Sequence, residues 1–261
     1  GSDAAKYGKH SLLVTGTGST KRSGLLDRAV QLLKDAGVSC TIFDQVTPNP
    51  LTTTAMDAAA LARKNNCDVV IGLGGGSIMD AAKAAAFLCT NEGDINDYIF
   101  GRLQGKNALP ILLVPTTCGT GSEGNGFAVL TNPETGDKKS LRGPFIVAKA
   151  SIIDPELMKT MPQHVLASVG FDALCHCMEA YLSGIGQPMT EMMALRGIRL
   201  SAENLPVVFH SYEKDGDDAC VAAAWEAVTW ASTLGGMVIH TAGVAGPHGM
   251  EHPASGLRNI V

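Results

Sequence analysis

The sequence predicts an α/β domain built on a parallel sheet over residues 1–155, followed by an all-helical domain over residues 156–261. In the first part, short apolar runs rich in valine and isoleucine alternate with helical stretches, which is the pattern of parallel strands joined by helices. After the Asp-Pro-Glu segment at 154–156 the strand signal ends, and glycine, alanine, leucine and methionine continue at helical spacing to about residue 246. With 261 residues, 45% of them hydrophobic, the chain can bury a sizeable core.

The elements of the first part follow one another in the order that a parallel sheet requires. Buried strands are expected at residues 11–15, 41–43, 68–73 and 110–114. Helices are expected at residues 24–36, 52–66 and 78–88. Gly37 follows the first helix, at a position where glycine commonly ends a helix. An antiparallel excursion is indicated by residues 127–130, a turn at 131–136, and residues 146–153.

The composition argues against several classes of partner. The net charge is −5 and there is no long run of Lys or Arg, so neither nucleic acid nor an anionic membrane surface is an expected partner. No run of eighteen or more apolar residues is present, so we expect no membrane-spanning helix. The seven cysteines form no Cys-x-x-Cys pair, and their odd count indicates free thiols in a reducing, cytoplasmic protein.

The strongest local motif is a glycine-rich turn, Gly74-Gly75-Gly76-Ser77, between a predicted strand and a predicted helix. Glycines let the backbone approach a phosphate closely, and the amino end of a helix adds N–H donors and partial positive charge. We therefore expect a pyrophosphate to bind here, while a merely tight turn is the simpler alternative. Ser77 and Asp80 also fit the N-cap and N3 positions of a capping box, which would give both side chains a structural role.

A second segment, residues 115–123, follows the next predicted strand and reads Pro-Thr-Thr-Cys-Gly-Thr-Gly-Ser-Glu. It places four hydroxyls and two glycines at the carboxyl end of a strand, which is the edge where open α/β sheets bind ligands. The composition also fits an ordinary loop, but the density of hydroxyl groups favours contact with a ligand.

The turn after the first strand, residues 16–21, only partly matches a dinucleotide-binding fingerprint, because Lys21 stands where the third glycine would be. No acidic residue lies in this turn to hold a ribose 2′-hydroxyl. Lys21 and Arg22 lie beside the turn, and cationic side chains at this position suit a 2′-phosphate.

In the helical part, Asp172 and His176 stand four residues apart and therefore share one face of a helix. A carboxylate and an imidazole on one face can hold a cation together, and an intrahelical hydrogen bond is the alternative for such a pair. Cys175 and Cys177 flank His176 but point elsewhere around the helix, so we interpret them as core residues.

Two further histidines, His248 and His252, also stand four residues apart. With Asp172 and His176 they complete a set of three or four candidate metal ligands. His240 lies upstream at the end of an apolar run, where a core or surface histidine fits better than a ligand.

Taken in order, five segments resemble the iron-containing (group III) alcohol dehydrogenases, and in particular their butanol-dehydrogenase-like branch. The segments are Gly-Gly-Gly-Ser-x-x-Asp-x-x-Lys at 74–83, Pro-Thr-Thr-x-Gly-Thr-Gly-Ser-Glu at 115–123, Asp-Pro-x-Leu at 154–157, Gly-x-Asp-Ala-Leu-x-His at 170–176 and His-Gly-Met-x-His-Pro at 248–253. Pro-Asn-Pro at 48–50 fits as well. The resemblance spans nearly the whole chain, and several motifs in the right order are far more specific than one motif alone.

The resemblance implies a dehydroquinate synthase-like architecture, with a nucleotide-binding α/β domain, a helical domain and a metal in the cleft. It implies Asp172, His176 and His248 as metal ligands, and His252 as a histidine near the nicotinamide that relays a proton. The implied cofactor contacts are Asn49, Gly75, Gly76, Ser77, Asp80, Thr116, Thr117, Thr120 and Lys138. Asp80 can instead cap the helix that binds the phosphates.

Two departures refine this resemblance. NAD-preferring relatives often carry an acidic residue at the end of the first strand, where this chain has Gly16, so NADP(H) is favoured over NAD(H). The family's fourth metal ligand is a histidine shortly after the His-Gly-Met-x-His segment, and no histidine follows His252 before Val261. From residues 1–261 we therefore expect three protein ligands, with residues 156–261 as the N-terminal part of the family's helical metal-binding domain.

The implied reaction interconverts a small-molecule alcohol and an aldehyde or ketone by hydride transfer, with the metal as Lewis acid. Fe²⁺ is the first expectation for the metal and Zn²⁺ is the alternative, because Asp and His ligands accept several divalent ions. The resemblance also implies a homodimer. A polyol (glycerol-type) dehydrogenase and a non-catalytic nucleotide-binding fragment are the alternative functions.

Overall fold

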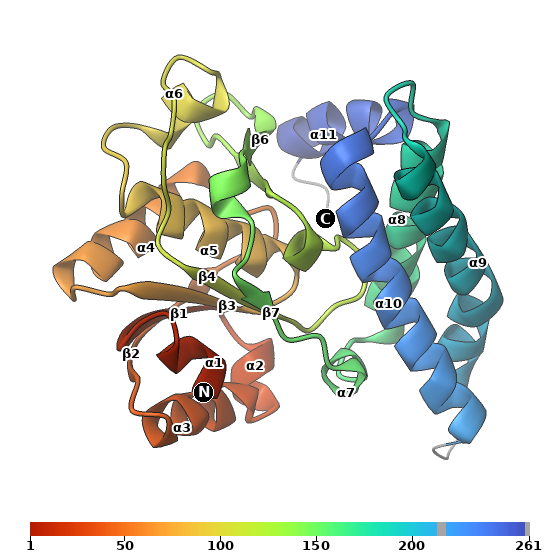
Figure 1. Cartoon of the computed structure of the whole chain (residues 1–261), viewed down its shortest axis with the longest axis horizontal. Coiled ribbons are helices and arrows are strands. Elements are labelled where there is room, and N and C mark those ends of the chain that lie inside the picture. The colour runs from red at the N-terminus through yellow and green to blue at the C-terminus, as the bar shows by residue number, and fades with distance from the viewer. Residues whose placement is uncertain (213–217, 259–261) are drawn as a thin grey trace. The chain divides into compact units, whose positions relative to one another are not determined.

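The computed structural model describes residues 1–212 and 218–258, and the chain divides into two compact units (Figure 1). The α/β unit comprises Gly1–Val114, Gly126–Ile152 and His252–Val261, and the helical unit comprises Pro115–Asn125 and Ile153–Glu251. This division differs from a single boundary near residue 155 in two places. Pro115–Asn125 belongs to the helical unit, and His252–Val261 belongs to the α/β unit.

The α/β unit is built on a parallel sheet, as predicted. Its strands, in the spatial order β2-β1-β3-β4-β7, are β2 (Ser39–Val46), β1 (His10–Gly16), β3 (Val69–Gly74), β4 (Ile111–Pro115) and β7 (Ala150–Ser151). Leu13 of β1 lies opposite Ile42 on one side and Ile71 on the other, and both pairings are parallel. The α/β class predicted from the alternation of strands and helices is therefore confirmed.

Helices cover both faces of this sheet, because alternate residues of a strand point to opposite faces (Figure 1). Leu12 and Val14 join the core beneath α4 (Thr52–Lys64) and α5 (Gly76–Leu88). Leu13 points the other way and joins the core beneath α3 (Leu25–Asp35). Burial on both faces explains why these strands read as continuous apolar runs.

Three short helices have no counterpart among the predicted elements. They are α1 (Ser2–Ala5), α2 (Ser19–Arg22) and α6 (Ile95–Ile99). Each spans about one turn, which is too short for a periodic apolar pattern to reveal it. α6 begins with a side-chain cap, since Asp94 accepts the backbone N–H of Asn96 at 2.8 Å.

The antiparallel excursion is present, but its second strand was predicted wrongly. β5 (Phe127–Thr131) pairs with β6 (Lys138–Arg142), whereas residues 150–151 pair in parallel with β4. β6 reads Lys-Lys-Ser-Leu-Arg, in which Leu141 alone is apolar. Leu141 is also the buried residue of this strand, so a hydrophobic pattern could not reveal the rest.

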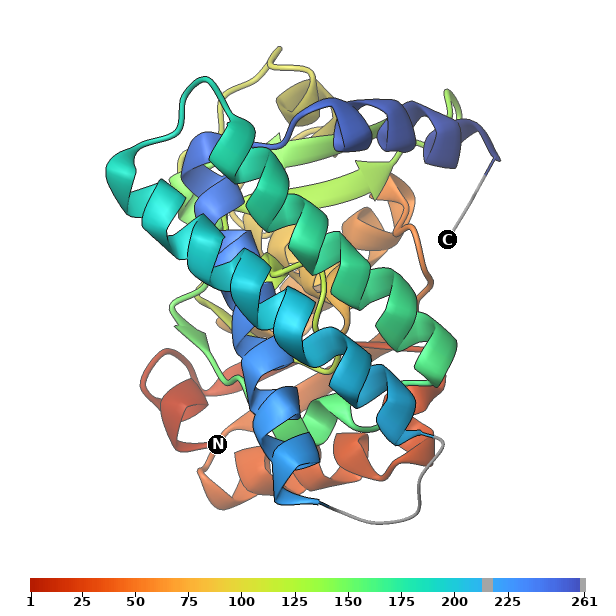
Figure 2. The ribbon, with the colours of Figure 1, turned by 90° about the vertical axis from the view of Figure 1, so that its right-hand side faces the viewer.

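The helical unit contains α7 (Pro155–Met158), α8 (Gln163–Leu182), α9 (Pro188–Ser211) and α10 (Ala219–Ala242). α7 begins as its sequence suggests, because the side chain of Asp154 accepts the backbone N–H of Glu156 and proline follows the cap. The long helices α8, α9 and α10 pack against one another (Figure 2). α11 (Gly246–Arg258) follows them, and its residues divide between the two units.

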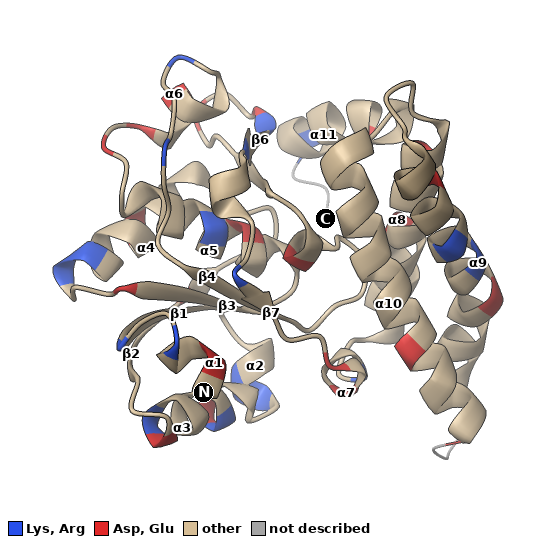
Figure 3. Cartoon of the chain, in the orientation of Figure 1, with Lys and Arg blue, Asp and Glu red and all other residues tan. Residues whose placement is uncertain are grey.

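By length and composition alone, α8 is apolar enough to cross a membrane. The charged residues of α8 are only Asp172 and Glu179, and α10 has only Glu226. Figure 3 accordingly shows α10 as almost entirely tan. Both charged residues of α8 lie on the face that meets other parts of the helical unit, and α8 packs against α9 and α10. We therefore interpret α8 as the core helix of this unit.

Candidate functional site

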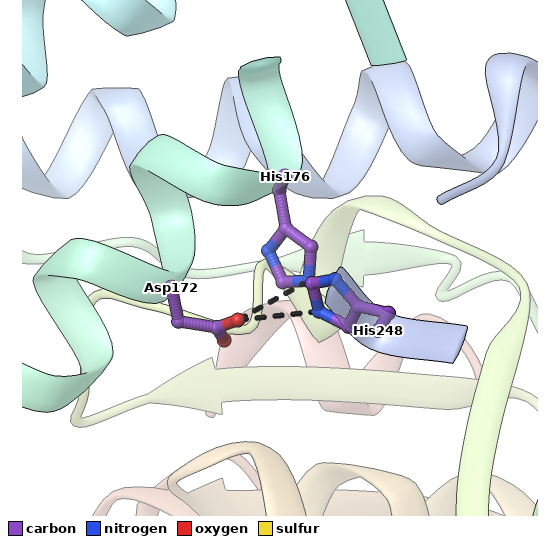
Figure 4. A group of neighbouring side chains, drawn as sticks. All are labelled: Asp172, His176 and His248. Carbon is purple, nitrogen blue, oxygen red and sulfur yellow. Dashed lines mark ion pairs between the residues drawn. The ribbon is translucent and has the colours of Figure 1, made fainter. Parts of the chain in front are cut away.

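α8 and α11 bring three predicted metal ligands together within the helical unit. Asp172 and His176 lie one turn apart on α8, and His248 lies in the first turn of α11. Asp172 Oδ1 lies 3.6 Å from His176 Nε2 and 3.3 Å from His248 Nε2. Figure 4 shows the three side chains converging, and one ligand atom of each lies within 4.8 Å of the others.

The spacing and chemistry of these three groups suit one divalent cation. Ligand atoms bound at about 2.0–2.2 Å to a tetrahedral ion lie roughly 3.3–3.6 Å from one another. Two imidazole nitrogens and a carboxylate oxygen form a donor set that Zn²⁺, Fe²⁺ and related ions accept. The alternative of a simple intrahelical hydrogen bond is weak, because 3.6 Å between Asp172 and His176 is too long for one.

The imidazole of His176 is buried, and its neighbours offset little of the free energy that burying a charged ring would cost. Among the residues that the structure describes, none forms a hydrogen bond with its Nδ1, although the backbone of Gly119 lies near enough to favour the protonated ring. Burial lowers the pKa of His176 more than the charge of Asp172 raises it. The ring is therefore neutral at pH 7, which is the form that binds a metal.

The imidazole of His248 faces two carboxylates instead. Its Nε2 faces Asp172, and its Nδ1 lies 2.6 Å from Glu179 Oε1. Burial lowers the pKa of His248, but the hydrogen bonds with Asp172 and Glu179 outweigh this effect and raise the pKa to about 9. Without a cation, this ring is therefore positively charged at pH 7 and balances the two carboxylates.

Glu179 is the member of this cluster that the sequence analysis missed. It is 4% exposed, and its second oxygen, Oε2, accepts the backbone N–H of Ala245 just before α11. Its position carried a usable signal, because Glu179 follows Asp172 by seven residues and His176 by three. Those intervals put all three side chains on one face of a helix.

The cysteines beside His176 lie apart from this cluster. Cys177 is fully buried, and its Sγ would lie 2.4 Å from a Cβ at Gly197 of α9, so it fills the contact between two helices. Burial raises the pKa of the Cys177 thiol to about 12, which disfavours the thiolate that binds metals. Burial also raises the pKa of Cys175. All seven cysteines of the chain are free thiols.

The two other histidines singled out in the sequence lie outside the cluster of three. His252 is half-buried, lies one turn beyond His248 on α11 and belongs to the α/β unit. Its role beside a nicotinamide stays a prediction. His240 is exposed in the last turn of α10.

The glycine-rich turn joins β3 to α5, as predicted. Gly74 has a φ of +153°, and a Cβ there would lie 2.4 Å from the side chain of Ile78, so the turn requires glycine at this position. The carbonyl of Gly75 accepts the first hydrogen bonds of α5. The N–H groups of Gly76 and Ser77 precede those bonds, so they lie at the helix end where an anion binds favourably.

The predicted capping box at this turn is wrong. α5 begins at Gly76, two residues earlier than predicted, and its N-cap is Gly75 without a side-chain cap. Asp80 consequently lies in the second turn, where Oδ2 accepts the backbone N–H of Val129 at 2.9 Å. The glycines allow the chain to turn straight into the helix, which moves Ser77 and Asp80 past the capping positions. A contact of Asp80 with the cofactor stays a prediction.

In the segment 115–125, the glycines serve helix packing. A Cβ at Gly119 would lie 2.5 Å from Val169 of α8. Gly121 has a φ of +58°, and a Cβ there would lie 2.4 Å from the backbone of Gly236 in α10. The segment therefore needs both glycines whether or not it binds a ligand. Its half-buried threonines, Thr116, Thr117 and Thr120, stay predicted cofactor contacts.

The remaining predicted cofactor contacts, Asn49 and Lys138, both lie in the α/β unit. Asn49 lies in the turn between β2 and α4 with a φ of +50°, a conformation that asparagine tolerates better than most residues. Lys138 begins β6, and its Nζ donates to Ser255 Oγ at 2.9 Å. That bond uses one of the three N–H donors of the ammonium. A contact of Lys138 with a cofactor stays a prediction.

The turn after β1 carries the two cations noted in the sequence. Lys21 Nζ donates to Asp44 Oδ2 on β2 in a short contact, and this hydrogen bond lowers the pKa of Asp44. The guanidinium of Arg22 folds over Gly18, where it would lie 2.4 Å from a Cβ. Asp44 could not be recognised from the motif, because it lies on the neighbouring strand and not in the turn.

Comparison with known proteins connects these features. Residues 1–155 match the family described as iron-containing alcohol dehydrogenase, and residues 166–261 match the Fe-containing alcohol dehydrogenase family, C-terminal. The chain is 37% identical to a 1,3-propanediol dehydrogenase of Klebsiella pneumoniae, over 97% of this chain and 64% of that one. It is 34% identical to an NADPH-dependent butanol dehydrogenase of Clostridium saccharobutylicum, over the same shares of the two chains.

Solved structures give the same result. An NADH-dependent butanol dehydrogenase A from Thermotoga maritima superimposes with a TM-score of 0.86 at 33% identity, covering 97% of this chain and 63% of that one. The predicted dehydroquinate synthase-like architecture agrees with this likeness. The chain thus spans slightly less than two thirds of the length of the curated relatives that it matches.

Proposed function

Since this chain belongs to the iron-containing alcohol dehydrogenase family, we propose that the protein interconverts an alcohol and an aldehyde or ketone with a nicotinamide cofactor and a divalent metal. The observation that carries the proposal is the convergence of Asp172, His176 and His248, which come from two helices. The Asp172 carboxylate offsets one of the two charges of a divalent ion. The two imidazoles serve as neutral ligands once His248 has released its extra proton, and room is left for further ligands.

In this proposal the three residues hold the ion, with Fe²⁺ as the first candidate and Zn²⁺ as the second. When bound, the ion would supply Lewis-acid polarisation of the substrate oxygen, and the nicotinamide would carry the hydride. The chain's own part is to bind and orient. Asp172 supplies the anionic ligand, and burial keeps the ring of His176 neutral and ready to bind. His252 is the candidate for moving the proton of the alcohol.

For the cofactor, we propose that the N–H groups of Gly76 and Ser77 bind the pyrophosphate at the amino end of α5. A helix of 13 residues supplies the dipole that favours an anion there. The proposed set of cofactor contacts is completed by Asn49, Gly75, Thr116, Thr117, Thr120 and Lys138. Asp80 also belongs to the proposed set, and it accepts the backbone N–H of Val129 as well.

We further propose that NADP(H) is preferred over NAD(H). The turn after β1 has no carboxylate at Gly16, and it carries Lys21 and Arg22, which suit a 2′-phosphate. Related proteins named for either cofactor exist, so the preference rests on these residues and not on the family. Asp44 competes with a 2′-phosphate for Lys21, because Lys21 already donates a hydrogen bond to it.

The experiment that tests the function uses the metal-free 261-residue chain. Titration with Co²⁺ should show one ion per chain by its visible absorption. Oxidation of NADPH by butanal, followed at 340 nm after loading with Fe²⁺ or Zn²⁺, measures turnover and is compared with NADH. Alcohol oxidation with butanol, 1,3-propanediol and glycerol distinguishes simple-alcohol from polyol activity. A chain that binds neither Co²⁺ nor NADPH would contradict the proposal, and cofactor binding without metal would select the non-catalytic alternative.

A further inference from the structure

Glu179 stands directly behind the candidate metal ligands and not among them. On α8, Asp172, His176 and Glu179 occupy positions i, i+4 and i+7, so the carboxylate lies one turn beyond the ligand pair on the same face. Both of its oxygens are engaged. Oε1 lies 2.6 Å from His248 Nδ1, and Oε2 accepts the backbone N–H of Ala245. One buried carboxylate therefore contacts both the ring and the backbone of the segment that carries His248.

The contact with Nδ1 determines which nitrogen of His248 can bind an ion. A carboxylate only accepts hydrogen bonds, so Nδ1 of His248 carries a proton and donates it to Oε1. In the neutral ring, Nε2 then carries the lone pair, and this is the atom that faces Asp172 at 3.3 Å. His248 is thereby fixed in the tautomer and the orientation that a metal at this position requires.

The contact with Ala245 fixes the position of the ring's backbone. Ala245 immediately precedes α11, and its N–H is among the groups that a helix leaves without an intrahelical partner at its amino end. A negative charge at this end is also favoured by the helix dipole. Glu179 thus connects the start of α11 to α8, and the separation of Asp172 from His248 depends on that connection.

His176 provides the contrast within the same cluster. Among the described residues, its Nδ1 has no hydrogen-bond partner, so no carboxylate fixes the tautomer of this ring as Glu179 does for His248. Burying a carboxylate costs free energy of folding unless the carboxylate is hydrogen-bonded or paired with a charge. Glu179 is only 4% exposed. The asymmetry between the two imidazoles points to a specific task for Glu179 at His248.

We propose that Glu179 is a positioning residue that holds His248 in the metal-binding tautomer and holds the start of α11 against α8. The proposal rests on the proposed function, since it concerns the affinity of the same three ligands for a divalent ion. It assigns to Glu179 no contact with the ion, the substrate or the nicotinamide.

The test compares Glu179→Gln with Glu226→Gln, a control at an exposed position on α10. The amide keeps the size of the side chain, but its nitrogen can only donate. It therefore cannot accept hydrogen bonds from both the His248 ring and the Ala245 N–H. Competition titration with Co²⁺ and a chromophoric chelator should show a 10- to 100-fold weaker affinity for Glu179→Gln, the range typical of outer-shell partners. The control should stay within twofold of the parent chain. Equal affinity in all three proteins would overturn the proposal.

A spectroscopic measurement separates positioning from a general loss of structure. In the Zn²⁺-loaded chain labelled with ¹⁵N-histidine, His248 should show a protonated Nδ1 and a metal-bound Nε2, which long-range ¹H–¹⁵N spectra report. This measurement uses the parent chain, so it decides the proposal even where Glu179→Gln does not fold. An Nδ1-bound ion would contradict it. Failure of the parent chain to bind Co²⁺ or Zn²⁺ would instead overturn the proposed function, which keeps the two failures distinguishable.

Discussion

The α/β unit and the helical unit each carry buried and half-buried charged side chains on one helix, but these side chains have different partners. On α5 of the α/β unit, Asp80 accepts the backbone N–H of Val129, and Lys83 donates to the carbonyl of Phe127 at 2.8 Å. Lys83 is fully buried. Both charged groups therefore bond to the backbone of β5, and they hold the hairpin against the helix.

On α8 of the helical unit, the charged and titratable groups face one another instead of a backbone strand. Asp172, His176 and His248 direct one ligand atom each towards a common point, and Glu179 fixes one of the rings from behind. The two helices therefore illustrate two roles of charged side chains. On α5 the charged groups bond to the backbone of a neighbouring strand, whereas on α8 atoms that carry lone pairs converge on one point, an arrangement that can bind a cation.

The largest effect should follow from His176→Ala. Removing one of three ligands should weaken Co²⁺ affinity by more than about 100-fold, beyond the range for outer-shell partners, and should abolish turnover. Competition titration and the NADPH assay measure the two quantities on one sample. Turnover that persists in a metal-free His176→Ala protein would break the contrast between the two helices, because α8 would then be structural as α5 is.

Gly121→Ala should produce the next largest effect. A Cβ at Gly121 would lie 2.4 Å from the backbone of α10, and its φ is +58°. Strain at a positive φ and overpacking together should lower the free energy of unfolding by about 2–5 kcal/mol, as measured by urea denaturation. Gly24→Ala is the matched control, because Gly24 has a φ of +72° and open space around its Cβ position. The control should lose only about 1–2 kcal/mol.

Lys83→Met tests directly whether the buried cation of α5 has a structural role. The thioether fits a similar volume but leaves the carbonyl of Phe127 without this donor, so the free energy of unfolding should fall by about 1–3 kcal/mol. Co²⁺ affinity should remain within twofold of the parent chain, since Lys83 serves β5. The opposite pattern, with stability unchanged and metal affinity reduced, would show that α5 contributes to the site after all.

The smallest expected effect concerns the cofactor. Asp44→Asn removes the partner of Lys21, and it should lower KM for NADPH by about two- to fivefold, the equivalent of an exposed ion pair. KM for NADH should not change, because NADH has no 2′-phosphate. Asp27→Asn, an exposed acid on α3, controls for net charge. An equal change for both cofactors would argue against a contact between Lys21 and the 2′-phosphate.

Much of the fold could be predicted because the relevant signals are local. Apolar runs marked β1, β3 and β4, and glycines marked the turn before α5. The second strand of the hairpin could not be predicted, since β6 has a single apolar residue and owes its place to pairing with β5. The capping box failed for a related reason, because the glycines before Ser77 allow the helix to begin earlier than a side-chain cap would require.

The candidate site shows the same division. The sequence by itself determined that Asp172 and His176 share a face, because a helix repeats every 3.6 residues and both lie on one helix. Tertiary packing places His248 beside this pair and Glu179 behind its ring, since His248 lies 69 positions after Glu179 and further still from Asp172 and His176. Periodicity operates over a few turns of one helix, whereas the approach of α11 to α8 depends on how the helices pack. The metal-binding geometry therefore follows from the packing, and the sequence supplies the groups that the packing brings together.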